Sequence, residues 1–294
     1  MTLSQSQFEA FLNDEVQKYK GVAVPVRASI LQRLFVQSAR CRKLHPNPGD
    51  EFCVPGIGPS YEIINRYTQE FAQERGTSRH YCKKAVIVEK IRPDGYMIMN
   101  GHHRWAAALR LNYPKIPIRI VNLTHEMDVR RMLENSRHDK RVALDLDEVV
   151  FRPEDDTAVE KPPRFPFNKL FPERVKLGIP ALFHYLATSG YDIWVYTAHY
   201  ESFDRIRALF RSYHVRVTGV VTGIARKNLP GHDIRTHMEK LIYNKYRCTV
   251  HIDNEAVIRV FSKTKEFEEH QLSGSAASWS REVMDIIGAM DRHD

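Results

Sequence analysis

The stretch that most constrains the fold is residues 141–151, RVALDLDEVVF. The apolar run before Asp145 predicts a short buried strand. Asp145 and Asp147 stand one residue apart, so in an extended chain their carboxylates point to the same side. Neighbouring carboxylates repel each other and are costly to desolvate unless a cation, typically Mg²⁺ with its all-oxygen shell, lies between them. An acidic surface turn is the alternative for a D-x-D pair considered alone.

Three further apolar runs downstream support the first interpretation. They are residues 192–198 (DIWVYTA), 217–222 (VTGVVT) and 249–255 (TVHIDNE). The first of these contains Thr197 near its end, and the last contains Asp253. Strands that end in polar residues and are separated by helix-length segments predict an open parallel α/β sheet. Such a sheet binds ligands at the carboxyl ends of its strands.

The order DLDEVV, VYTA, lysine and HIDNE resembles the haloacid dehalogenase superfamily of phosphotransferases over residues 140–260. Its DLDE and IDN motifs are most similar to phosphatases of the polymerase-C-terminal-domain and polynucleotide-3′-phosphatase kind. The resemblance implies that Asp145 is the nucleophile that becomes an aspartyl-phosphate, and that Asp147 is the general acid/base. It also implies that Thr197 and a lysine hold the phosphoryl oxygens, and that Asp253 completes a Mg²⁺ site with both aspartates. These roles agree with the need for cations when a carboxylate attacks phosphorus.

Two lysines are candidates for the phosphate-binding position. Lys227 lies in the loop after the third predicted strand, where members of the superfamily often place it, and we favour it. Lys240 lies inside a predicted helix and is nearer to Asp253 in the sequence. The intervals on either side of Thr197, where cap modules normally lie, leave room for a flap but not for a large cap.

The N-terminal half has a different character. Residues 1–139 hold 21 of the Lys and Arg residues against 14 Asp and Glu, and so carry most of the net charge of +8. This excess favours an anionic partner, although a solvated basic surface is the alternative. Here we expect helices at 4–20, 26–43, 60–74 and 105–111, and strands at 52–54, 85–91, 96–99 and 115–121.

The motif NGHHR, residues 100–104, lies at the junction of a predicted strand and helix. Gly101 permits a tight turn, and the free amides of the helix start favour an anion such as phosphate. Arg104 and the imidazoles of His102 and His103 add to this preference, with Asn100 completing the motif. In the alternative interpretation, the histidines only satisfy hydrogen bonds at a capped helix start.

The sequence MNGHHRWAAALRLN, after strand, turn and strand, is similar to the ParB/sulfiredoxin fold over residues 50–122. The resemblance implies nucleotide binding at a Gly-x-(His/Arg)-Arg loop. His102 stands where sulfiredoxins have a cysteine, and the Glu-Arg-Arg run of ParB partition proteins is missing. The His-His-Arg form is closer to the free-serine kinases, although Asn100 replaces their usual aspartate. A kinase also needs a carboxylate base, for which Glu51 and Glu62 are both candidates.

We therefore predict a helical N-terminal extension (1–49), a smaller α+β ParB/sulfiredoxin-like domain (50–123), a connector (124–140) and a Rossmann-like α/β haloacid dehalogenase domain with a parallel sheet and no large cap (141–294). The four cysteines lack metal-ligand spacing and are expected to be reduced structural thiols. No apolar stretch approaches the ~20 residues that span a bilayer, and the first residues do not resemble a secretory signal, so a cytoplasmic protein without a membrane partner is expected.

The expected function is a Mg²⁺-dependent phosphohydrolase with an N-terminal nucleotide- or phosphate-binding domain. Its substrate would be a phosphorylated small molecule, a nucleotide or a nucleic-acid end. One alternative is a bifunctional phosphotransferase whose N-terminal domain is a serine-kinase-like kinase. Another is a nucleotide-gated nucleic-acid-binding protein with a vestigial C-terminal domain.

Overall fold

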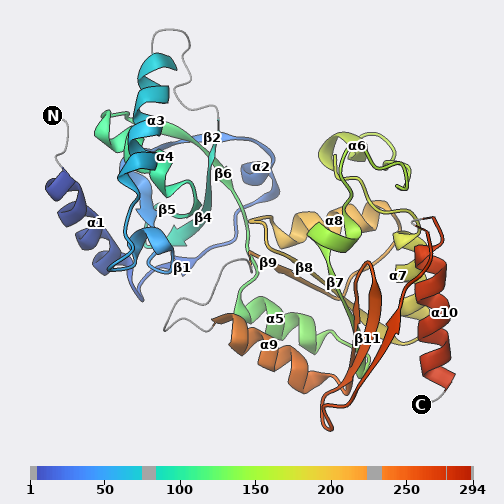
Figure 1. The fold of residues 1–294 in the computed structure, drawn as a ribbon. Coiled ribbons are helices and arrows are strands. Elements are labelled where there is room, and N and C mark those ends of the chain that lie inside the picture. Colours follow the sequence, from blue (N-terminus) through green and yellow to red (C-terminus); the bar gives the residue numbers. More distant parts are fainter. Residues whose placement is uncertain (1–4, 75–83, 224–233, 276, 293–294) are drawn as a thin grey trace. The chain divides into compact units, whose positions relative to one another are not determined.

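Two β-sheets organise the chain, each at the centre of its own unit, in this computed structural model (Figure 1). The structure describes residues 5–74, 84–223, 234–275 and 277–292. The first unit extends to Asn122, and the second begins at Leu123. Both units mix helices with strands, as an α/β protein requires.

The sheet of the first unit is mixed and has the order β2-β6-β4-β5-β3, with β1 added to β4. The antiparallel pair β4–β5 is joined by the predicted turn at 93–95, while β4–β6 and β3–β5 are parallel. The strands are β1 (Val24–Pro25), β2 (Gln37–Arg40), β3 (Leu44–Pro46), β4 (Val86–Arg92), β5 (Tyr96–Asn100) and β6 (Lys115–Ile120).

Trp105 lies at the centre of the core of the first unit. Its ring is fully buried, lies 6.3 Å from that of Phe8, and donates its indole N–H to the carbonyl of Cys41 (3.0 Å). These contacts join the helices that carry Phe8 and Trp105 to the segment between β2 and β3. The N-terminal residues therefore pack into the same core as the helix that follows the NGHHR motif. The helices are α1 (Gln5–Tyr19), α2 (Ile30–Leu34), α3 (Tyr61–Glu74) and α4 (His102–Arg110).

Two predicted elements of this unit are wrong. The helix expected over 26–43 is only the five-residue α2, which begins at a capping box on Ser29 and ends where Phe35 turns extended. The apolar stripe that suggested a long helix is exposed, with 67% of Ile30 and 73% of Leu31 accessible, so no core contact extends the helix. The strand expected at 52–54 is a 3₁₀ turn at Glu51–Cys53, because the Asp50 side chain caps it.

The sheet of the second unit has the order β12-β11-β10-β7-β8-β9. The four strands predicted from the sequence pair in parallel, with β7 between β10 and β8. The antiparallel β11 and β12 extend the sheet beyond β10 and were not anticipated. The strands are β7 (Lys140–Asp145), β8 (Tyr191–Thr197), β9 (Gly219–Thr222), β10 (Cys248–Ile252), β11 (Ala256–Phe261) and β12 (Phe267–Gln271).

Helices cover both faces of this sheet (Figure 1). Helices α5 and α9 lie side by side on the face that carries Trp194, whereas α7 and α10 pack on the face that carries Val142 and Leu144. This alternation of faces follows from the two-residue period of the strands. The helices are α5 (Glu126–Glu134), α6 (Phe167–Leu170), α7 (Ile179–Thr188), α8 (Phe203–Ser212), α9 (Ile234–Lys245) and α10 (Trp279–Arg292).

The segment between β7 and α7 carries no folded cap. Residues 152–178 contain only the four-residue α6 and a pair of isolated bridges, of which one joins Phe151 to Val175.

Across the described ranges, no helix is long and apolar enough to cross a membrane. Cys41, Cys53 and Cys248 are free thiols, and burial raises the pKa of Cys53 to about 12, whereas Cys82 lies outside the described residues.

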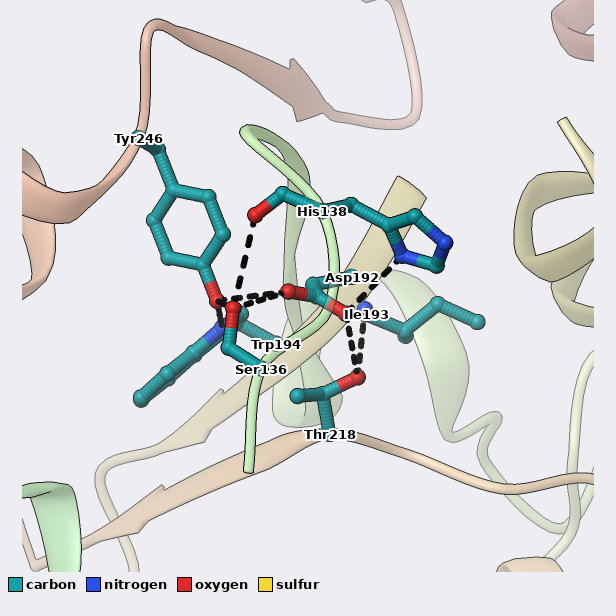
Figure 2. Close-up of polar contacts among 7 residues, drawn as sticks. All are labelled: Ser136, His138, Asp192, Ile193, Trp194, Thr218 and Tyr246. Carbon is teal, nitrogen blue, oxygen red and sulfur yellow. Dashed lines mark hydrogen bonds and ion pairs between the residues drawn. The ribbon is translucent and has the colours of Figure 1, made fainter. Parts of the chain in front are cut away.

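The buried carboxylate of Asp192 links several segments of the second unit at the amino-terminal ends of the parallel strands (Figure 2). Asp192, at the start of β8, accepts hydrogen bonds from the hydroxyls of Tyr246 (3.0 Å), Thr218 (3.3 Å) and Ser136. The Nδ1 atom of His138 lies 3.2 Å from the same carboxylate. These partners come from the segments before β7 and β9 and from the end of α9, so one side chain links four parts of the chain.

Replacement of Asp192 should therefore destabilise the fold. In Asp192→Ala the Thr218 hydroxyl loses its acceptor and the Tyr246 hydroxyl keeps only Ser136 Oγ, and each buried donor left unsatisfied costs about 1–3 kcal/mol. We expect urea unfolding to show a loss of at least about 2 kcal/mol. The exposed Asp155→Ala is the control and should change stability little. Equal stability of the two variants would contradict the role given to Asp192.

Candidate functional site

The carboxyl ends of three adjacent strands form the candidate site. Asp145 is the last residue of β7, Thr197 is the last residue of β8, and Asp253 follows directly after β10. Because β7 pairs in parallel with both neighbours, the three side chains are brought to one edge of the sheet. All three line a single cavity of about 710 Å³.

The backbone after β7 fixes the position of Asp145. A single π-helical turn, Leu146–Val150, follows the strand at once, and such turns occur frequently at functional sites. Within it, the backbone N–H groups of Asp147 (2.7 Å) and Glu148 (3.0 Å) donate to Oδ1 of Asp145. These bonds fix the orientation of the carboxylate. The other oxygen, Oδ2, has no hydrogen-bond partner in the part of the chain that the structure describes.

Asp147 and Thr197 contact each other directly. The Thr197 hydroxyl donates to the Asp147 carboxylate, at 2.8 and 3.0 Å from its two oxygens, and the Ala198 N–H donates to one of them (2.9 Å). Thr197 is only 2% exposed, whereas the Asp147 side chain is 24% exposed, so the pair joins a buried hydroxyl to a partly exposed carboxylate. Asp147 borders a second cavity of about 420 Å³, which is lined in addition by Glu173 and Arg205.

The expected metal site stays a prediction. Within the described ranges, no group of three or more His, Cys, Asp or Glu side chains is arranged to hold a metal ion. The Asp147 carboxylate accepts hydrogen bonds from Thr197 and Ala198 and borders a different cavity from Asp145 and Asp253, so its place among the metal ligands stays a prediction. Asp145 and Asp253 line the same cavity, and Mg²⁺ is commonly bound by one or two carboxylates with water completing its shell. This pair therefore suits Mg²⁺ in its chemistry.

The structure describes only one of the two lysines that are candidates for binding phosphate. Lys227 falls within residues 224–233, outside the described residues, so the preference for it stays a prediction. Lys240 lies on α9 and lines the cavity that contains Asp145 and Asp253. The structure thus places Lys240 at the site without deciding between the two.

A third lysine, which the sequence analysis missed, positions the edge of the sheet. Lys176 is buried, donates its ammonium N–H to the side chain of Asn254 (2.9 Å), and lies 3.6 Å from the ring centroid of Trp279. Asn254 in turn donates to the backbone carbonyl of Glu148 (2.8 Å). Lys176 therefore links the residue after Asp253 to the turn after β7. No sequence motif marks it, since its role depends on contacts between distant segments.

The loop at residues 100–104 has the predicted backbone. Gly101 has φ +102°, a left-handed conformation that favours glycine, and it precedes the first residue of α4. The Arg104 side chain folds back over this glycine and donates to the carbonyl of Lys84 (3.1 Å). Asn100 is exposed at the end of β5. The turn, the helix start and a cation thus occur together.

The two histidines of this loop act as hydrogen-bond acceptors. Nε2 of His102 accepts from the Asn47 N–H (3.2 Å), and Nε2 of His103 accepts from the Ser60 N–H (3.2 Å). Burial lowers the pKa of both, that of His102 to about 4 despite Asp50 nearby. They are neutral at pH 7 and brace neighbouring loops. Arg104 is therefore the cation that this motif offers to an anion.

Comparison with known proteins bears on the first unit. Residues 78–136 match the ParB N-terminal domain. This span includes the loop at 100–104 and runs beyond the expected boundary at 123 into α5. It ends before Asp145, so the haloacid dehalogenase interpretation of the second unit stays a prediction.

One similar solved structure is that of the C-terminally truncated chromosome-partitioning protein ParB from Caulobacter crescentus, complexed with CTP-γ-S. The identity is 21%, the TM-score is 0.24, and the alignment covers 35% of this chain and 59% of that chain. This chain thus spans less than two thirds of that protein. None of the curated proteins matched the sequence.

The buried Lys176 predicts a pH dependence of stability. Burial, and secondarily the charge of Arg152, lower its pKa from 10.5 to about 8. Between these values the unfolded chain holds a proton that the folded chain has released, so the penalty for charging Lys176 fades as pH rises. The free energy of unfolding of wild type relative to Lys176→Met should rise from pH 8 to 10.5 and be constant below pH 8.

Chemical denaturation at several pH values measures this difference. The exposed Lys161→Met serves as the control, and its difference from wild type should stay flat over the same window. If the difference in free energy of unfolding between wild type and Lys176→Met is also constant from pH 8 to 10.5, the pKa of Lys176 is not lowered by folding.

Proposed function

We propose that the second unit is a Mg²⁺-dependent phosphohydrolase of the haloacid dehalogenase type. The observation that supports this most is the convergence of Asp145, Thr197 and Asp253 on one cavity at the carboxyl edge of a parallel sheet. Ligands bind at this edge in open α/β sheets. The oriented Asp145 carboxylate, with one free oxygen, has the properties of a nucleophile.

In the first step, Oδ2 of Asp145 attacks the phosphorus of a phosphomonoester. The bond from phosphorus to the alcohol oxygen breaks, and Asp147, in its protonated form, gives its proton to the departing alkoxide. The N–H donors on Oδ1 keep the attacking carboxylate aligned during this step. The Asp147 carboxylate is held in place by Thr197 and Ala198, two residues along the chain from Asp145.

In the second step, the Asp147 carboxylate removes a proton from water, which attacks the aspartyl-phosphate and releases inorganic phosphate. Asp145 is regenerated, and Asp147 is protonated for the next cycle. When bound by Asp145 and Asp253, Mg²⁺ would neutralise charge on the carboxylate and the phosphoryl group. Lys240, or Lys227, would contribute the remaining positive charge on the phosphoryl oxygens.

A second candidate function concerns the first unit, and the family match at residues 78–136 favours it. We propose that this unit binds a nucleotide at the loop 100–104 and that the nucleotide controls nucleic-acid binding. The helix start after Gly101 offers free N–H groups, and Arg104 adds a fixed positive charge. The excess of Lys and Arg before residue 140 would attract a phosphate backbone. Of the two functions, only this one has support from the comparisons.

Substitution of Asp145 tests the phosphohydrolase. Asp145→Asn keeps the shape of the side chain but removes the nucleophile, so release of phosphate should fall to background. Asp147→Asn should slow turnover by roughly 10²–10⁴-fold, as loss of a general acid/base does. The assay follows phosphate release from nucleotides, phosphoserine, sugar phosphates and phosphorylated oligonucleotides, with Mg²⁺ or with a chelator. Wild-type turnover in Asp145→Asn would exclude the mechanism.

Substitution of Arg104 tests the nucleotide site. Arg104→Ala should weaken binding of CTP, ATP or ADP by about 1.5–3 kcal/mol, the range for hydrogen bonds to charged groups. Isothermal titration gives the affinities, and Arg110→Ala, on the same helix, is the matched control. Fluorescence anisotropy of a labelled duplex, with and without the preferred nucleotide, then tests the gating. A wild type that binds none of these nucleotides rules out the proposed site.

A further inference from the structure

The cavity of the candidate active site continues from the carboxyl edge along one face of the sheet. Arg141, Ala143 and Asp145 alternate with the core residues of β7, so all three face α9 and line this cavity. His251 of β10 lines it from the neighbouring strand. The small side chain of Ala143 leaves open the space between Asp145 and Arg141.

Arg141 is a buried cation with neutral partners. It is 7% exposed, and its guanidinium donates from Nε to the Thr249 hydroxyl (2.8 Å) and from Nη1 to the Tyr196 hydroxyl (2.8 Å). Its Cζ atom lies 5.6 Å from the ring centroid of Tyr246. Among the described residues, no carboxylate lies within 4.0 Å of this guanidinium. The Nη2 atom donates no hydrogen bond to any described residue.

A largely buried cation with neutral partners favours an anion nearby. A buried charge lacking a counterion loses its hydration and recovers little from neutral hydroxyls. Helix α9 brings one charge of each sign, on Glu239 and Lys240, to the same cavity. The fork of N–H donors on an arginine suits phosphate and carboxylate, so an anion in the cavity would satisfy the free donors.

The position of Arg141 relates it to the chemistry at Asp145. The two residues are four apart on β7, roughly 13 Å between Cα atoms at 3.3 Å per residue. Tyr196, which accepts from the guanidinium, is the register partner of Asp145, so the arginine side chain extends toward the catalytic edge. A molecule the size of a phosphorylated sugar spans the remaining interval.

We propose that Arg141 binds a second anionic group of the substrate, so that the preferred substrates are phosphomonoesters with a phosphate or carboxylate at the far end of a sugar-sized or shorter scaffold. This inference rests on the proposed phosphohydrolase for its catalytic part. Arg141 does not touch the reacting phosphoryl group, and it acts on the choice of substrate.

Matched substrate pairs test the proposal. Values of kcat/KM are measured on fructose 1,6-bisphosphate against fructose 6-phosphate, and on 3-phosphoglycerate against glycerol 3-phosphate, which separates a phosphate from a carboxylate. Arg141→Gln should reduce kcat/KM by about 10- to 100-fold on the doubly anionic member of the preferred pair and change the other member little. Arg141→Lys, which keeps the charge, should recover part of the preference. Arg211→Gln, an exposed arginine on α8, is the matched control for net charge.

A binding measurement separates this inference from the proposed reaction. Isothermal titration of fructose 1,6-bisphosphate and 3-phosphoglycerate into wild type, Arg141→Gln and Arg141→Lys needs no turnover. Binding that is lost in Arg141→Gln and kept in Arg211→Gln supports the anion site even if no substrate is hydrolysed. Equal losses on both members of each pair, or wild-type binding in a folded Arg141→Gln, would overturn the inference, and melting temperatures identify an unfolded variant.

Discussion

The parallel pairing of β7 with both β8 and β10 is the constraint on which the second unit depends. Parallel strands end at the same edge, so three side chains that lie far apart in the sequence come to one cavity. Collecting carboxylates in this way is unfavourable by itself, because their charges repel. The protein reduces the cost with backbone N–H donors on Asp145 and with the hydroxyl of Thr197 on Asp147.

Much of this edge could be predicted because strand ends are a local property of the sequence. Apolar runs that stop at Asp145, Thr197 and Asp253 fix both the strands and the edge at which these residues lie. The side-chain partners could not be predicted in the same way. The Asp147 side chain lies in the π-helical turn and contacts Thr197, a residue fifty positions away, and Lys176 acts only through contacts with distant segments.

In the first unit, the backbone of the motif could be predicted but the roles of its histidines could not. The turn at Gly101 and the helix after it follow from the motif, yet the histidines beside it serve as neutral acceptors for Asn47 and Ser60. A sequence contains the residue type but not its burial, and burial decides whether an imidazole carries charge. The same reason explains the wrong prediction of a helix over 26–43, because Ile30, Leu31, Leu34 and Phe35 of its apolar stripe are exposed.

The contact between Lys176 and Trp279 has a consequence for the order of synthesis. Every strand that carries a catalytic candidate leaves the ribosome before α10, so the parallel sheet can pair while the aromatic neighbour of Lys176 is still missing. Until α10 docks, the lysine keeps more of its hydration, and its bond to Asn254 competes with water. In the nascent chain, the strand ends that carry Asp145, Thr197 and Asp253 can thus come together before α10 packs against Lys176.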